Sequence, residues 1–156
     1  MNNVLITKDN FDVGEQYEAL CNETSKSGAV VFFVGLVRDF YDDIDGEKIT
    51  HLQLHHYPGM TERLCEEIIE QAQTRYPFEK ARVIHRVGDI AATEQIVMVA
   101  VASQHRDNAF QAAQFIMDYL KTKATFWKKE MGQRGEQWVE QKDKDLTALD
   151  RWQEKN

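Results

Sequence analysis

The chain has 156 residues, of which 42% are hydrophobic and 29% are charged, and its net charge is −7 at pH 7. This size and composition are typical of a folded domain with one core, and they exclude a disordered chain. The acidic balance argues against a protein that binds nucleic acid over a broad surface.

The spacing of apolar residues predicts the secondary structure along the chain. In chain order we expect a strand at 4–7, a helix at 14–21, a strand at 28–37, an acidic loop at 39–47, a strand at 49–57, a helix at 58–76, strands at 81–87 and 95–102, a helix at 106–123 and a terminal helix at 146–152. Paired strands between helices favour an α+β fold with a mixed or antiparallel sheet. We expect residues 1–156 to form that single domain.

Three of these elements have a clear expected burial. The segment 28–37 is a continuous apolar run, which is typical of a strand buried on both faces, although periodicity alone also allows a buried helix. The strand at 95–102 is almost entirely Val, Ala, Met and Ile, so we expect it at the centre of the sheet. In the helix at 106–123 the residues expected to face the core are Phe110, Ala113, Met117 and Leu120.

The segment 121–129 contains four lysines and two aromatic residues. If the helix continues through it, Lys121 and Lys128 project from one face, about 10.5 Å apart along the axis. A lysine beside apolar surface and other cations has a lowered pKa and can act as an acid, a base or a nucleophile. The alternative is a solvated basic helix end that complements the helix dipole.

Further cationic residues lie where strands end. His105 and Arg106 open the helix that follows the strand at 95–102, and free N–H groups at a helix start favour anions, so this corner is a candidate phosphate site. The alternative is an ordinary capped corner. Arg38 ends the strand at 28–37, where it is either a functional residue at the sheet edge or the solvent boundary of the strand.

The histidines do not have the spacing of a metal site. His51 and His55 share one face of their strand but lie about 13 Å apart, and His56 points to the other face. Zinc needs donors at about 2.0–2.1 Å, so we interpret these histidines as structural or surface residues and expect no metal.

The expected compartment is the cytoplasm. No stretch approaches the ~20 apolar residues of a membrane helix, and the first residues do not have the pattern of a signal peptide. Cys21 and Cys65 form no CxxC pair and have no basic neighbours in sequence, which favours packing roles in a reducing environment.

Several short segments together resemble one protein family. They are GAVV at 28–31, GLVR at 35–38, HYPGMT at 56–61, VIHRVG at 83–88, SQHR at 103–106, FIMDYLKTK at 115–123 and FWKKE at 126–130. In this order and spacing they resemble the MoaE family, the large subunits of molybdopterin synthase, from about residue 11 to residue 152.

The resemblance implies an activity and its partners. Such proteins have an α/β hammerhead fold and form a central homodimer, which binds a small ubiquitin-like subunit at each end to give a heterotetramer. The C-terminal Gly-Gly thiocarboxylate of the small subunit supplies sulfur to cyclic pyranopterin monophosphate. The product is the molybdopterin dithiolene, in molybdenum cofactor biosynthesis. We therefore expect a sulfurtransferase without a cofactor.

The resemblance also assigns roles to residues. Lys121 and Lys128 are the expected catalytic residues. The expected substrate-binding residues are Arg38, His105 and Arg106, which hold the phosphate, and Lys129 and Glu130, which complete the pocket wall.

Two positions depart from the family pattern. Thr125 stands where the family has proline, which allows the helix to run further. Leu36 stands where a basic residue is expected, which weakens any substrate role for that position. Two alternatives remain at this point: a non-catalytic module that binds a ubiquitin-like tail, and an unrelated phosphate-ester enzyme.

Overall fold

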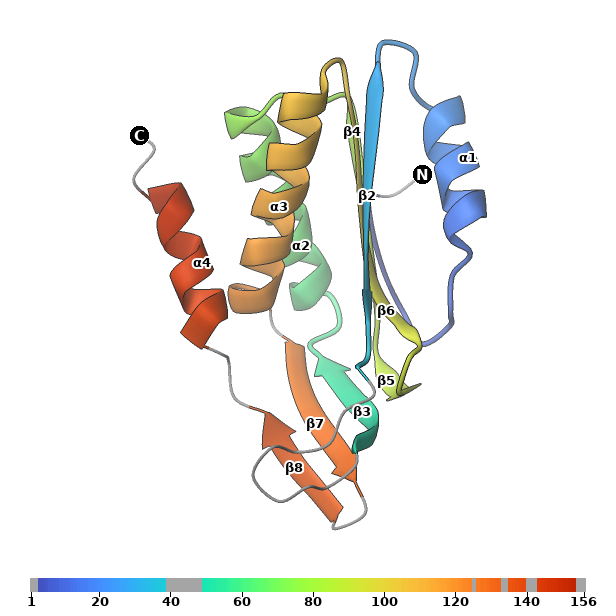
Figure 1. Cartoon of the computed structure of the whole chain (residues 1–156), viewed down its shortest axis with the longest axis vertical. Coiled ribbons are helices and arrows are strands. Elements are labelled where there is room, and N and C mark those ends of the chain that lie inside the picture. The colour runs from blue at the N-terminus through green and yellow to red at the C-terminus, as the bar shows by residue number, and fades with distance from the viewer. Residues whose placement is uncertain (1–2, 39–48, 125, 133–134, 140–142, 154–156) are drawn as a thin grey trace.

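The computed structural model describes residues 3–38, 49–124, 126–132, 135–139 and 143–153. The strands form two sheets, and helices cover both faces of the first one (Figure 1), which confirms the predicted α+β class. None of the described helices is both long and apolar enough to cross a membrane. The elements are β1 (Val4–Thr7), α1 (Val13–Asn22), β2 (Ala29–Leu36), β3 (Ile49–His56), α2 (Met60–Arg75), β4 (Lys80–Arg86), β5 (Gly88–Ala91), β6 (Gln95–Ser103), α3 (Arg106–Thr122), β7 (Phe126–Gly132), β8 (Gly135–Val139) and α4 (Asp143–Gln153).

The first sheet has the strand order β1-β4-β6-β2, in which β1 is parallel to β4 and the other pairs are antiparallel. β6 is central, as its apolar sequence predicts. Val97 and Val99 belong to the core cluster that the sheet forms with α2 and α3. Met98 and Ala100 belong to the cluster on the opposite face, with Leu20 of α1. Because helices cover both faces, β6 carries apolar residues at every position from 96 to 102.

β2 lies at the edge of this sheet and pairs only with β6 among the described strands. The prediction that its apolar run is buried on both faces is therefore wrong: its residues are partly exposed, and Phe33 is 42% exposed. The run is apolar because α1 and α3 each cover part of one face. An edge strand keeps one row of backbone groups available for another strand.

The second sheet has the order β5-β3-β7-β8, and every pair in it is antiparallel. It lies at the lower end of the molecule in Figure 1. β5 follows β4 almost directly, and Gly88 at its start has a φ of 83°, which costs little only for glycine. The chain therefore passes from the first sheet to the second over a few residues.

The predicted helix at 106–123 is confirmed, but it does not continue to Lys128. α3 ends at Thr122, where the Lys123 N–H donates to the Tyr119 carbonyl (2.7 Å), and residues 126–132 form a strand. β7 pairs with β3, which places Phe126 opposite His56. Pairing with a neighbouring strand outweighs the local helical pattern, since strand formation depends strongly on tertiary context. Thr125 lies outside the described residues.

The buried face of α3 also differs in part from the prediction. Phe110 is 60% exposed, so its expected place in the core is wrong. The buried residues recur every three or four positions, and their alanines let the helix lie close to the sheet, while Phe110 falls beside this stripe. The buried residues of α3 are Ala109, Ala112, Ala113, Phe115, Ile116 and Leu120.

Candidate active site

Three of the predicted cations come from elements that end where the two sheets meet. Lys121 lies in the last turn of α3, and Lys128 is the third residue of β7. Arg38 follows β2, where the Val37 N–H donates to the Glu94 carbonyl (2.9 Å) in the turn between β5 and β6. The two lysines therefore belong to a helix and a strand joined by a short connection, and not to one helix face.

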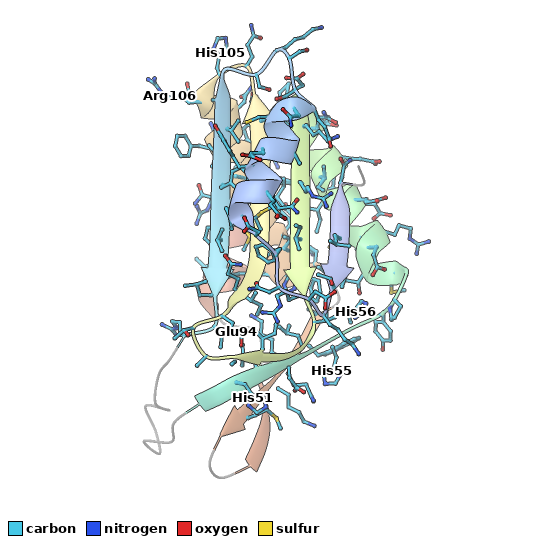
Figure 2. The ribbon with its side chains drawn as sticks, turned by 90° about the vertical axis from the view of Figure 1, so that its right-hand side faces the viewer. His51, His55, His56, Glu94, His105 and Arg106 are labelled. Atoms are coloured by element: carbon cyan, nitrogen blue, oxygen red, sulfur yellow. The ribbon has the colours of Figure 1, made fainter. Side chains whose placement is uncertain are left out.

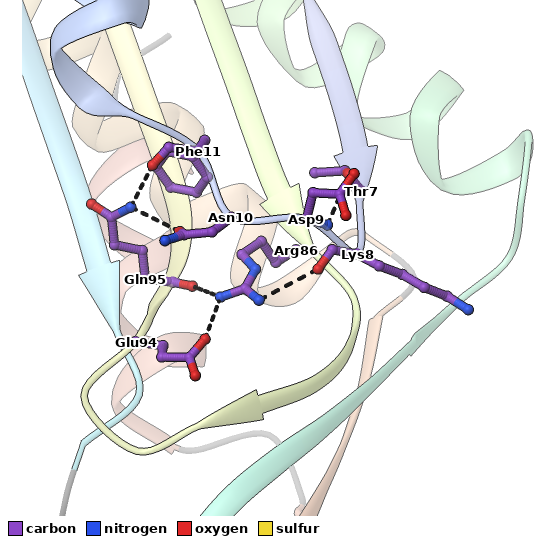
Figure 3. Close-up of polar contacts among 8 residues, drawn as sticks. All are labelled: Thr7, Lys8, Asp9, Asn10, Phe11, Arg86, Glu94 and Gln95. Atoms are coloured by element: carbon purple, nitrogen blue, oxygen red, sulfur yellow. Dashed lines mark hydrogen bonds and ion pairs between the residues drawn. The ribbon is translucent and has the colours of Figure 1, made fainter.

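Arg86 fixes the backbone at this junction (Figure 3). Its Nη1 donates to the Glu94 carboxylate (2.9 Å) and to the Gln95 carbonyl (3.0 Å), and its Nη2 donates to the Lys8 carbonyl (3.4 Å). Arg86 is only 6% exposed. The network ties the segment after β1 to the turn between β5 and β6, and the same turn binds the residue before Arg38.

β7 presents its two adjacent lysines on opposite faces. Lys128 pairs with Leu54, which is 2% exposed, so it lies on the inner face of the second sheet. Lys129 is the next residue and therefore points to the outer face. Within one chain the structure therefore does not bring Lys129 to the face of Lys128, where the predicted pocket wall would need it, and Lys129 is left out of the proposed site. Glu130 pairs with Leu52 in the same register.

A buried histidine lies beside this region, and it is not among the predicted site residues. The His85 ring stacks on Phe126, with centroids 3.9 Å apart and planes at 17°. Its Nδ1–H donates to the Arg86 carbonyl (2.8 Å). The pKa of His85 is lowered from 6.5 to about 4, mainly by burial, with smaller lowering effects of the nearby Lys128 and His56 and an opposing effect of the hydrogen bond to Arg86. The imidazole is therefore neutral at pH 7.

His105 and Arg106 lie at the other end of α3 (Figure 2). α3 spans 17 residues, or about 25 Å, so this pair is far from Lys121. Both residues are exposed, and the His105 side chain makes no capping hydrogen bond. Gly28 packs closely here, because a Cβ on it would lie 2.8 Å from the Gln104 carbonyl oxygen. One chain alone does not bring the predicted phosphate-binding pair to the predicted catalytic lysines.

The three histidines of β3 contact neighbouring polar side chains. His55 Nε2 lies 3.0 Å from Gln53 Oε1, and His56 Nε2 lies 3.5 Å from a Glu62 carboxylate oxygen. His51 Nε2 lies 4.0 Å from an Asp89 oxygen. In the part of the chain that the structure describes, no three His, Cys, Asp or Glu residues are grouped so that they could hold a metal ion.

The two cysteines lie on α1 and α2. Cys65 is fully buried in α2, which confirms its predicted packing role. Burial, together with Glu62 and Glu66, raises the pKa of its thiol to about 12, so the thiolate is scarce at pH 7. Cys21 is partly exposed on α1, across the first sheet from α3.

Comparisons with known proteins identify the family of this chain. Residues 6–123 match the family model described as MoaE protein. The chain is 49% identical over 150 residues to the molybdopterin synthase catalytic subunit of Vibrio cholerae (96% of this chain, 97% of the relative) and 45% identical over 149 residues to that of Escherichia coli (96% and 97%). The MoaE protein structure from Burkholderia ambifaria superposes with a TM-score of 0.83 at 42% identity, over 98% of this chain and 99% of that one. The chain therefore belongs to the MoaE family.

Proposed function

We propose that this chain is the catalytic subunit of a cytoplasmic molybdopterin synthase. It transfers sulfur from the C-terminal thiocarboxylate of a small ubiquitin-like subunit to cyclic pyranopterin monophosphate and so forms the molybdopterin dithiolene. The observation that carries this proposal is the 45–49% identity to catalytic subunits over 96% of the chain. The cations at the junction of the sheets support it, because they offer an anionic substrate a positive site on an acidic protein.

Lys121 and Lys128 are the proposed catalytic residues, and Arg38 is the proposed phosphate contact beside them. A lysine here can donate a proton to the departing phosphate oxygen, stabilise the charge that develops on it, or form a transient covalent intermediate. The sulfur comes from the partner subunit. In support, Cys65 is buried and held as a thiol, and Cys21 lies across the first sheet from α3.

His105 and Arg106 complete the site from a second copy of the chain. Ala29 pairs with Ser103, so the start of β2 lies beside the corner that carries His105, whereas the end of β2 leads to Arg38. Two β2 edges that pair antiparallel about a two-fold axis place the start of one beside the end of the other. The phosphate-binding pair of one copy then lies toward Arg38 of its partner.

Exposed apolar side chains on this side of the molecule support the homodimer. Phe33 is 42% and Leu36 is 56% exposed on β2, and Phe110 is 60% exposed on α3. Large exposed apolar side chains beside a free strand edge are typical of a surface that another chain covers. Each dimer then binds two small subunits and forms a heterotetramer.

A single-turnover assay tests the function. The purified chain is mixed with cyclic pyranopterin monophosphate and the thiocarboxylated small subunit, and dithiolene product is measured beside Lys121→Ala. Product from the native chain and little from the variant is the expected result. A native chain that binds the small subunit but gives no product would instead be a non-catalytic module. Turnover of the substrate without any thiocarboxylate would indicate a phosphate-ester enzyme.

A further inference from the structure

His85 is a polar ring within an apolar layer. It lies on β4, where it pairs with Ile6 of β1 and Val97 of β6, and it is 8% exposed. By strand alternation it shares the face of Val83 and Val87, which belong to the core on the side of α2 and α3. A histidine in such a place either serves only as a core residue or acts on a group beside it.

The hydrogen bond of His85 fixes its tautomer. A carbonyl oxygen can only accept, so Nδ1 carries the proton that it donates to Arg86 (2.8 Å). In the neutral ring Nε2 is then an acceptor with a free lone pair. The backbone of β4 thus holds one side of the ring and leaves the other side available for a donor.

The stacked ring connects the first sheet to β7. Phe126 is the first residue of β7, and the centroid distance of 3.9 Å with planes at 17° fixes it face to face against His85. Lys128 lies two residues further on the same face of the strand, about 7 Å along it. The positive charge of Lys128 disfavours protonation of the His85 ring, and so does His56. His56 itself lies beside the Glu62 carboxylate.

We propose that His85 is a positioning residue for sulfur transfer, whose neutral imidazole, held by the Arg86 carbonyl and stacked on Phe126, fixes the place of Lys128 in the site. The inference rests on the proposed role of Lys128. A rigid ring beneath the first residue of β7 limits the movement of the strand, and the Nε2 lone pair offers the ammonium an acceptor. Lys129 lies on the outer face of the same strand and is a matched control.

The first test compares turnover in single and double variants. His85→Phe keeps an aromatic ring on Phe126 but removes the lone pair and the Nδ1–H, and we expect the single-turnover rate to fall about 10- to 100-fold with unchanged binding of the small subunit. In a Lys128→Ala background the same change should have little further effect, because residues that act through one another are not additive. An equal loss in both backgrounds would overturn the proposal and leave His85 a core residue.

The second test needs no variant of His85. The imidazole is titrated by NMR in the native chain, in Lys128→Ala and in Lys129→Ala. In Lys128→Ala the neighbouring cation is lost, so the midpoint of the His85 titration should rise. In Lys129→Ala this midpoint should be unchanged. No rise in Lys128→Ala would overturn the proposed contact. If Lys128→Ala turns over as fast as the native chain, the proposed role of Lys128 itself is wrong. That outcome is distinct from failure of the His85 proposal.

Discussion

The two ends of α3 differ in what surrounds their cationic residues. At the C-terminal end, Lys121 lies near the junction of the sheets, to which β7 brings Lys128 and the end of β2 brings Arg38. At the N-terminal end, His105 and Arg106 are exposed, about 25 Å away along the axis. The C-terminal end carries the proposed catalytic lysines, and the N-terminal end carries the proposed phosphate-binding pair. A complete site therefore requires either two copies of the chain or a substrate that reaches both ends.

The largest expected effect comes from the lysines at the first end. Lys128→Ala and Lys121→Ala should each lower single-turnover product formation about 10²- to 10⁴-fold, the range for loss of a group that transfers a proton. Lys129→Ala should change it only slightly, because that side chain lies on the outer face of β7. Binding of the small subunit, measured by calorimetry, should be unchanged in all three. A large loss in Lys129→Ala would show that the face assignment is wrong.

A mixing experiment tests whether the two ends act across copies. Arg106→Ala and Lys128→Ala chains are each expected to have little activity alone. If random exchange makes half of the dimers mixed, and each mixed dimer has one intact site, about a quarter of native activity returns. Product formation in the mixture is the measurement. No recovery, with exchange verified by mass spectrometry, would mean that each chain uses its own two ends.

The Arg86 network at the first end should contribute to stability. Arg86→Leu removes charge-assisted hydrogen bonds to Glu94 and to two carbonyls, so we expect the free energy of unfolding to fall by about 1.5–3 kcal/mol. Glu94→Gln keeps an acceptor for Nη1 and should cost less. Urea denaturation of both variants gives the comparison, and equal losses would contradict the dominant role of the Arg86 side chain.

The last expected effect is a change of stability with pH. The pKa of His85 is lowered from 6.5 to about 4 in the folded chain, so the unfolded chain binds the proton more readily. Its contribution to stability is therefore fully present above pH 6.5 and is lost as the pH falls from 6.5 toward 4. In His85→Phe this part of the pH dependence should be absent. Urea midpoints across that interval measure it, and parallel curves for the two chains would contradict the neutral buried state.

The sequence was enough to predict the elements of the first sheet and its helices. β6 is apolar at consecutive positions because both of its faces are covered, and a pattern of that kind needs no knowledge of the neighbours. Cys65 was also predicted to pack, and it is fully buried in α2. The cationic residues of the site were found from short segments that resemble one family, and the comparisons confirm that family over almost the whole chain.

Of the second sheet, the sequence predicted only β3; tertiary structure alone decided its other strands and the layout of the site. β7 is a strand because it pairs with β3, more than 70 residues earlier in the chain, although its own residues Phe-Trp-Lys-Lys-Glu have no strand pattern. That pairing turned Lys128 inward and Lys129 outward. His85 had no sequence signal beyond its place in a family segment, since its stacking on Phe126 joins two distant strands. Local patterns record which faces are apolar, but only the packing of distant segments determines which polar groups meet.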